Sequence, residues 1–180
     1  MIHTRQITNE RPPSRAGGTV QTAVEVRRTD PLREPSDGSN EHLFAFYGTL
    51  MTSAYSEAGV SFARGENLGR SLGPCQIPGT LYAVNAGFPA LMEGTGIVHG
   101  ELWECKPEHL QLATEKLDTI ESYRHWREHD SMYLRRRVRL IEPDVEAWVY
   151  VWNFGLRGLE PIPTGRWESG APWRYTDLED

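Results

Sequence analysis

The sequence predicts an α+β fold built around a twisted or closed sheet, and three observations lead to this prediction. Short apolar runs separated by glycine and proline turns recur along the chain from residue 43 to residue 153, as expected for strands. One segment, which begins at Pro107, has the apolar periodicity of a helix. The 180 residues fit one domain, and 38% of them are hydrophobic, so the chain can bury a core.

The strands are predicted from apolar runs that end at glycine or proline. The first run, Leu43–Tyr47, is continuously apolar and stops at Gly48, which is typical of a buried strand. A helical or irregular piece is expected around Ser53–Ala63. Five further strands are predicted from later runs bounded by turn residues: Leu68–Leu72, Gly79–Val84, Ile97–Glu104, Tyr133–Ile141 and Glu146–Asn153. Many strands and few helices indicate the α+β class.

The last two predicted strands differ in their regularity. Glu146–Asn153 alternates between small apolar residues and an aromatic face formed by Trp148, Tyr150 and Trp152. The small face suits a core, and the aromatic face either walls a pocket or covers the sheet. In Tyr133–Ile141 the apolar residues fall on both parities, which predicts a bulge within Arg135–Arg137.

The charge balance and the apolar runs exclude several functional classes. Lys and Arg number 19 and Asp and Glu number 25, so the net charge of −6 argues against a dedicated nucleic-acid-binding protein. In such a chain Arg135–Arg137 indicates an ion-paired or solvated face rather than a phosphate-binding patch. No apolar run approaches the roughly 18 residues of a membrane-spanning helix. The first residues also lack the apolar stretch of a secretory signal. We therefore expect a cytoplasmic protein with no membrane or nucleic-acid partner.

Residues 1–40 differ in composition from the rest of the chain. They contain four prolines, three glycines, many charged residues and no aromatic residue. A segment with so little to bury is expected to stay loosely ordered. The predicted organisation is therefore an N-terminal extension over residues 1–40, followed by one folded domain over residues 41–180.

The predicted helix carries an acidic residue at the end of its apolar face. Four residues at helical spacing form the stripe expected to face the core: Leu110, Ala113, Leu117 and Ile120. Glu121 follows Leu117 by four positions and so lies on the same face. Burial and the negative end of the helix dipole both raise the pKa of a carboxyl group, which makes Glu121 a candidate acid or base near neutral pH. In the alternative interpretation the helix ends at Ile120, and Glu121 points into water or pairs with a nearby arginine.

A glycine turn follows the first strand and forms a second candidate feature. Where Tyr47–Leu50 turns at Gly48, successive backbone N–H groups become exposed and can hold a carboxylate or a developing oxyanion. An ordinary strand–glycine turn accounts for the same pattern, so the turn alone does not decide the function.

The sequence contains no convincing metal or cofactor motif. His125 and His129 are four residues apart, but no third imidazole lies in register with them. The glycines of Gly94–Gly100 do not have the spacing of a dinucleotide fingerprint and lead into a strand rather than a helix. We therefore expect neither a metal nor a cofactor.

Several short motifs follow one another in the order found in a known family. They are Phe46–Met51, Gly79–Tyr82, Phe88–Leu91, Val98–Trp103, Leu117–Tyr123, Tyr133–Arg135, Ala147–Tyr150 and Ile162–Trp167. Together, over about residues 43 to 168, they resemble the γ-glutamylcyclotransferase-like superfamily. The last motif is most similar to the branch that acts on γ-glutamylamines.

This resemblance implies a fold, an activity and a set of site residues. Members of the superfamily fold as a small mixed β-barrel, here of about five to seven strands, flanked by helices. They convert a γ-glutamyl amide into 5-oxoproline and a free amine without metal or cofactor. By resemblance, Glu121 is the acid/base and a small γ-glutamyl compound is the substrate. The residues matched to substrate binding are Tyr47, Gly48, Thr49, Leu50, Tyr133 and Tyr150.

Two departures from the family pattern and several alternative functions stay open. Ser122 stands where glycine is usual. Arg166 stands where an acidic residue is common, and this second departure concerns the leaving-group side of the pocket.

The reaction can also deprotect a γ-glutamyl-tagged biosynthetic intermediate. A non-catalytic binder of γ-glutamyl or amino-acid ligands would keep the same fold. Nucleic-acid binding through the arginines predicts a steep salt dependence. The oligomeric state is left open.

Overall fold

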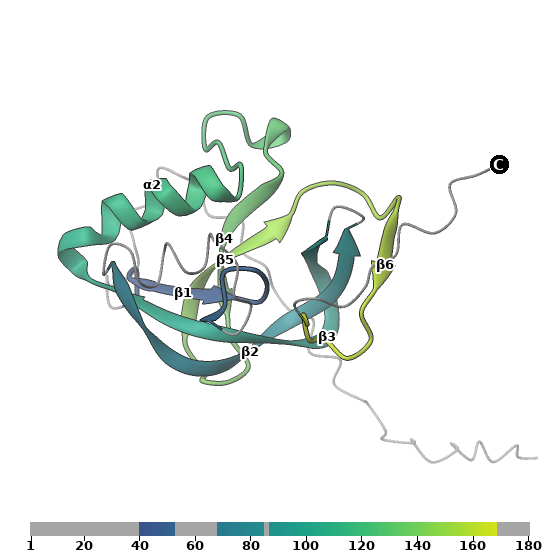
Figure 1. Ribbon diagram of the computed structural model, residues 1–180, viewed down its shortest axis with the longest axis horizontal. Coiled ribbons are helices and arrows are strands. Elements are labelled where there is room, and N and C mark those ends of the chain that lie inside the picture. Colours follow the sequence, from purple (N-terminus) through teal and green to yellow (C-terminus); the bar gives the residue numbers. More distant parts are fainter. Residues whose placement is uncertain (1–39, 53–67, 85–86, 169–180) are drawn as a thin grey trace, which may run out of the picture.

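The computed structural model describes residues 40–52, 68–84 and 87–168 (Figure 1). The predicted extension over residues 1–40 lies outside this part of the chain except for Asn40. The helical or irregular piece expected around Ser53–Ala63 lies outside it as well.

The described strands form one curled, mixed sheet, which confirms the predicted fold class (Figure 1). Their order in the sheet is β4-β5-β1-β3-β2-β6. β1 pairs parallel with β5 and antiparallel with β3, which makes the sheet mixed. Because β4 and β6 end the order without pairing with each other, the sheet is a half-barrel rather than a closed ring. The bounds are β1 Leu43–Phe46, β2 Gly69–Val84, β3 Phe88–Cys105, β4 Tyr133–Arg139, β5 Glu146–Trp152 and β6 Leu159–Pro161.

Two long strands replace several of the short ones that the sequence predicts. Leu68–Leu72 and Gly79–Val84 belong to the single strand β2, and Ile97–Glu104 is the second half of β3. The prediction was wrong because glycine and proline were interpreted as breaks. In the structure Gly73 and Gly79 have positive φ and lie at two register shifts, where they bend the β2–β3 hairpin without interrupting it.

Pro74 and Pro78 fit inside β2 because of the side on which their backbone nitrogens lie. In a strand, backbone groups of every second residue point to the same side, so Gln76 points to the same side as both prolines. Gln76 exchanges backbone hydrogen bonds with Ile141 and Glu142 rather than with β3. The nitrogens of Pro74 and Pro78 therefore also face away from β3. Neither proline removes a hydrogen bond from the β2–β3 ladder.

The β4–β5 pair corrects one prediction and confirms another. The register runs without a shift from Tyr133↔Trp152 to Arg139↔Glu146, so the predicted bulge is absent from this strand. Apolar residues occur at both odd and even positions of β4 because other parts of the protein cover both faces of this strand. The arginines are ion-paired, as predicted: Arg135 with Asp118, Arg136 with Glu128 and Arg137 with Glu146.

The helix predicted at Pro107 forms, and it is the α-helix of the described residues. A 3-10 turn, η3 (Pro107–His109), leads into α2 (Leu110–Ile120), which lies across the sheet (Figure 1). Ala113 and Leu117 are fully buried in the core. Ile120 does not face the core as predicted: it is 43% exposed, because the helix ends there at the rim of a pocket. A second 3-10 turn, η4 (Glu128–Asp130), precedes β4.

The helices of the described chain are short. None of them has the length and apolar character that crossing a lipid bilayer requires.

Candidate active site

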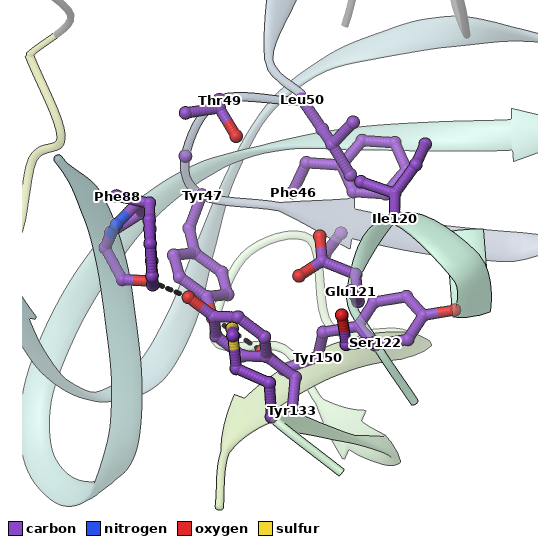
Figure 2. Close-up of a pocket in the computed structure, with 14 residues that line it drawn as sticks. Phe46, Tyr47, Thr49, Leu50, Phe88, Ile120, Glu121, Ser122, Tyr133 and Tyr150 are labelled. Carbon is purple, nitrogen blue, oxygen red and sulfur yellow. Dashed lines mark hydrogen bonds between the residues drawn. The ribbon is translucent and has the colours of Figure 1, made fainter. Parts of the chain in front are cut away.

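The end of β1, the end of α2 and parts of β3, β4 and β5 enclose a pocket of about 240 Å³ (Figure 2). This volume lies just below the range of about 300–1,000 Å³ typical of ligand pockets, so it suits a small metabolite. The seven residues that the sequence analysis assigns to the site all line it, and their chemical roles remain predictions. The described lining comprises Ala45, Phe46, Tyr47, Gly48, Thr49, Leu50, Phe88, Pro89, Ile120, Glu121, Ser122, Met132, Tyr133 and Tyr150.

The turn after β1 brings Tyr47–Leu50 to the pocket. All four residues of β1 are buried, so the strand is anchored in the core up to the turn. The backbone N–H of Met51 donates to the carbonyl of Gly48 at 3.0 Å, which closes the turn. Glycine is required at position 48 by space, because a Cβ atom there would collide with the ring of Pro89.

Replacing Gly48 by Ala is expected to lower the free energy of unfolding by about 1–3 kcal/mol, because the added methyl group overpacks against Pro89. The matched control is Gly155→Ala, since a Cβ atom at Gly155 meets no atom within 4 Å. Urea unfolding of both variants measures the difference. Equal losses in the two variants would show that the contact with Pro89 does not constrain this turn.

Glu121 stands directly after α2, and its side chain faces the pocket (Figure 2). Its backbone N–H donates to the carbonyl of Leu117 at 2.9 Å, so it continues the helical turn. Ser122 then adopts a φ of 52°, which redirects the chain. Burial raises the pKa of the Glu121 carboxyl to about 7. Glu121 forms no ion pair with an arginine of the described chain, so this carboxyl can both accept and donate a proton near neutral pH.

Three tyrosine rings surround this carboxyl, and their hydroxyl groups all donate to other atoms of the protein. Tyr47 donates to the carbonyl of Tyr150 at 2.6 Å, and Tyr133 donates to the carbonyl of Pro89 at 2.5 Å. Burial raises the pKa of all three tyrosines, so they stay neutral. Tyr133 and Tyr150 therefore line the site without donating a hydrogen bond to Glu121. Their oxygens keep lone pairs that can accept a hydrogen bond from a ligand.

Asp118, one helical turn before Glu121, ties the end of α2 to the sheet. Its carboxylate accepts a hydrogen bond from the hydroxyl of Tyr150 at 2.6 Å. The same carboxylate forms an ion pair with the Arg135 guanidinium, with an N–O distance of 2.7 Å. The Arg135 guanidinium lies over the rings of Tyr123 and Trp148, at 5.4 and 5.3 Å from their centroids. Sequence reasoning did not assign Asp118 a role, although its spacing of three residues from Glu121 was a usable signal.

Sequence reasoning also missed the apolar part of the lining. Phe88, Pro89 and Met132 come from the ends of β3 and β4, and only their tertiary arrangement brings them to Glu121. Phe88 and Pro89 belong to one of the ordered family motifs, but the sequence analysis assigned neither of them to the site, and no motif includes Met132. Arg166, the second departure from the family pattern, does not belong to the described lining.

A family model described as "Gamma-glutamyl cyclotransferase, AIG2-like" matches residues 44–169. The chain belongs to this AIG2-like γ-glutamyl cyclotransferase family. The match includes every described lining residue of the pocket, from Ala45 to Tyr150, and it confirms the resemblance inferred from the ordered motifs. Among curated proteins, none matches the chain.

Solved structures show the same fold. Uncharacterized protein PH0828 from Pyrococcus horikoshii is 23% identical, with a TM-score of 0.50, covering 69% of this chain and 87% of its own. The protein c4763, specific to uropathogenic Escherichia coli, is 17% identical, with a TM-score of 0.51. This match covers 69% of the present chain and 91% of c4763. The protein ytfP from Escherichia coli, known from a solution structure, is 25% identical, with a TM-score of 0.49. This match covers 69% of the present chain and 95% of ytfP. At these identities the first two matches show the fold of this AIG2-like family member and nothing finer.

Proposed function

We propose that this member of the AIG2-like γ-glutamyl cyclotransferase family converts a γ-glutamyl amide into 5-oxoproline and a free amine. One observation carries the proposal: the carboxyl of Glu121, with a pKa raised to about 7, shares a small pocket with the Tyr47–Leu50 turn. Such a carboxyl suits a reaction that needs a base in one step and an acid in the next.

The reaction is an intramolecular transfer. The α-amine nitrogen of the substrate forms a bond to the carbonyl carbon of its own γ-amide, and the bond from that carbon to the leaving nitrogen breaks. The attacking ammonium nitrogen loses two protons as it becomes the lactam N–H, and the leaving nitrogen gains two as it departs as an ammonium ion. Glu121 carries these protons in turn from the first nitrogen to the second, so no water is consumed and nothing is oxidised or reduced. Holding amine and carbonyl together in a small pocket removes up to several kcal/mol of the barrier.

The remaining lining residues bind and shape the substrate in this proposal. The backbone of Gly48–Leu50 holds either the α-carboxylate or the oxyanion that develops on the γ-carbonyl. Tyr47, Tyr133 and Tyr150, fixed by their own hydrogen bonds, bend the glutamyl chain toward its cyclic form.

Incubation of the protein with a panel of γ-glutamyl amides tests the proposal. We expect 5-oxoproline and free amine to appear in equal amounts, measured by chromatography. Release of glutamate instead of 5-oxoproline would make the protein a hydrolase. Calorimetric binding of the amides with neither product formed would make it a non-catalytic binding domain.

A further inference from the structure

An aromatic surface leads away from the pocket and is not used by the proposed chemistry. Phe88 and Tyr133 line the pocket, and Trp152 contacts both of them, with ring centroids 6.4 Å and 5.3 Å away. Phe154 meets Trp152 edge to face at 5.5 Å. Phe88, Tyr133, Trp152 and Phe154 therefore form one continuous row of contacting rings, which we call the aromatic wall.

The aromatic wall runs from the pocket into solvent. Its inner member Tyr133 is buried, whereas Phe154 is 47% exposed. Trp152 is the cross-strand partner of Tyr133, so the β4–β5 ladder holds the wall in place. In Figure 2 Phe88 lies on the side of the pocket opposite Glu121. A rigid apolar surface that continues a cavity is typical of a ligand-binding site.

The charges of the pocket restrict which ligand group can lie on this wall. Within the described lining, Glu121 is the residue with a carboxyl group, and no Lys, Arg or His belongs to it. A carboxylate next to the leaving nitrogen, as in an α-amino acid, would meet no cation of the described lining, and it would lie close to Glu121. Desolvating such a carboxylate without a partner is costly. An uncharged apolar group gains free energy by covering aromatic surface.

We propose that the amine released by this protein is an apolar amine with an aromatic substituent, which packs on the aromatic wall, and is not an amino acid joined through its α-nitrogen. The inference rests on the proposed cyclotransferase function, because it specifies the second half of the same substrate. The glutamyl half lies between Tyr47–Leu50 and Glu121, and the amine half extends past Phe88 toward Trp152 and Phe154.

Three matched substrates test this inference: the γ-glutamyl amides of 2-phenylethylamine, ethylamine and phenylalanine. The ethylamide lacks only the ring, and γ-glutamylphenylalanine adds only a carboxylate. We expect kcat/KM for the phenylethylamide to exceed both others by about tenfold or more. Equal values for the three substrates, or a preference for γ-glutamylphenylalanine, would overturn the inference.

A substitution in the exposed part of the aromatic wall distinguishes an effect on amine binding from an effect on the catalytic residues. Phe154→Ser is expected to lower kcat/KM for the phenylethylamide about threefold to tenfold more than it lowers kcat/KM for the ethylamide. Trp126→Ser is the matched control, because Trp126 is 69% exposed and belongs neither to the described lining nor to the wall. An equal loss with both substrates would mean that Phe154 has only a structural role.

Binding measurements distinguish failure of this inference from failure of the proposed function. Calorimetry of the same three amides with the Glu121→Gln variant reports affinity without turnover. If the wild-type protein cyclises none of them but the phenylethylamide binds most tightly, the reaction is wrong and the specificity of the wall is supported. If all three are cyclised and bound equally well, the reaction is supported and the inference about the amine is wrong.

Discussion

Replacing Glu121 by Gln will lower the rate of 5-oxoproline formation at saturating substrate at least about 100-fold, and by up to about 10⁴-fold. Gln has nearly the same shape as Glu but cannot take the proton from the attacking ammonium or return it to the leaving amine. Because the side chain keeps its size, the KM for the γ-glutamyl amide is expected to change little. Steady-state kinetics with a reactive γ-glutamyl amide measure both quantities.

The control for this variant lies on the same helix. Glu115→Gln makes the identical chemical change at an exposed position, where the side chain accepts a hydrogen bond from Gln111. It is expected to retain wild-type kinetics. Turnover by Glu121→Gln at the wild-type rate would remove the proposed acid/base role.

The same substitution is expected to stabilise the protein in a way that depends on pH. The pKa of Glu121 is about 7 in the folded protein and near 4.5 when the group is fully hydrated. Below pH 4.5 the group is protonated in both states. Between pH 4.5 and 7 only the unfolded state ionises, so the wild-type protein loses stability as the pH rises. The loss is complete above pH 7 and amounts to about 3 kcal/mol.

Gln does not titrate, so Glu121→Gln avoids this loss. The stability advantage of the variant over the wild-type protein should grow by about 2–3 kcal/mol between pH 5 and pH 8. Urea unfolding at the two pH values measures it, with Glu115→Gln as the variant expected to show no such change. An advantage that stays constant with pH would mean that the Glu121 carboxyl is not kept from water in the folded protein.

The sequence predicts the site better than the strands. Glu121 and the Tyr47–Leu50 turn are identified by local features, namely an apolar helical stripe and a buried run that ends at glycine. The long strand β2 was divided into two, because Pro74, Pro78 and their neighbouring glycines resemble turns, and only the second half of β3 was predicted. Only the curvature of the hairpin, which depends on contacts distant in the sequence, shows that these residues bend a strand.

Other parts of the site could not be predicted, because they are made by tertiary contacts. Phe88 and Met132 meet Glu121 only after the sheet curls. The exposure of Ile120 follows from where α2 ends against the pocket, and periodicity alone assigned this residue to the core. The hydrogen bond from Tyr150 to Asp118 joins two elements 32 residues apart, so no local pattern reveals it.

The prolines of β2 also affect how molecules of this protein meet one another. A half-barrel has free edges, and a free edge invites a strand from a second molecule to add to it, which is a route to aggregation. Along the part of β2 that β6 does not pair with, Gln76 already exchanges backbone hydrogen bonds with Ile141 and Glu142, and Pro74 and Pro78 on either side of it offer no N–H group to an incoming strand. Two residues that look like interruptions in the sequence thus protect an open sheet from polymerising.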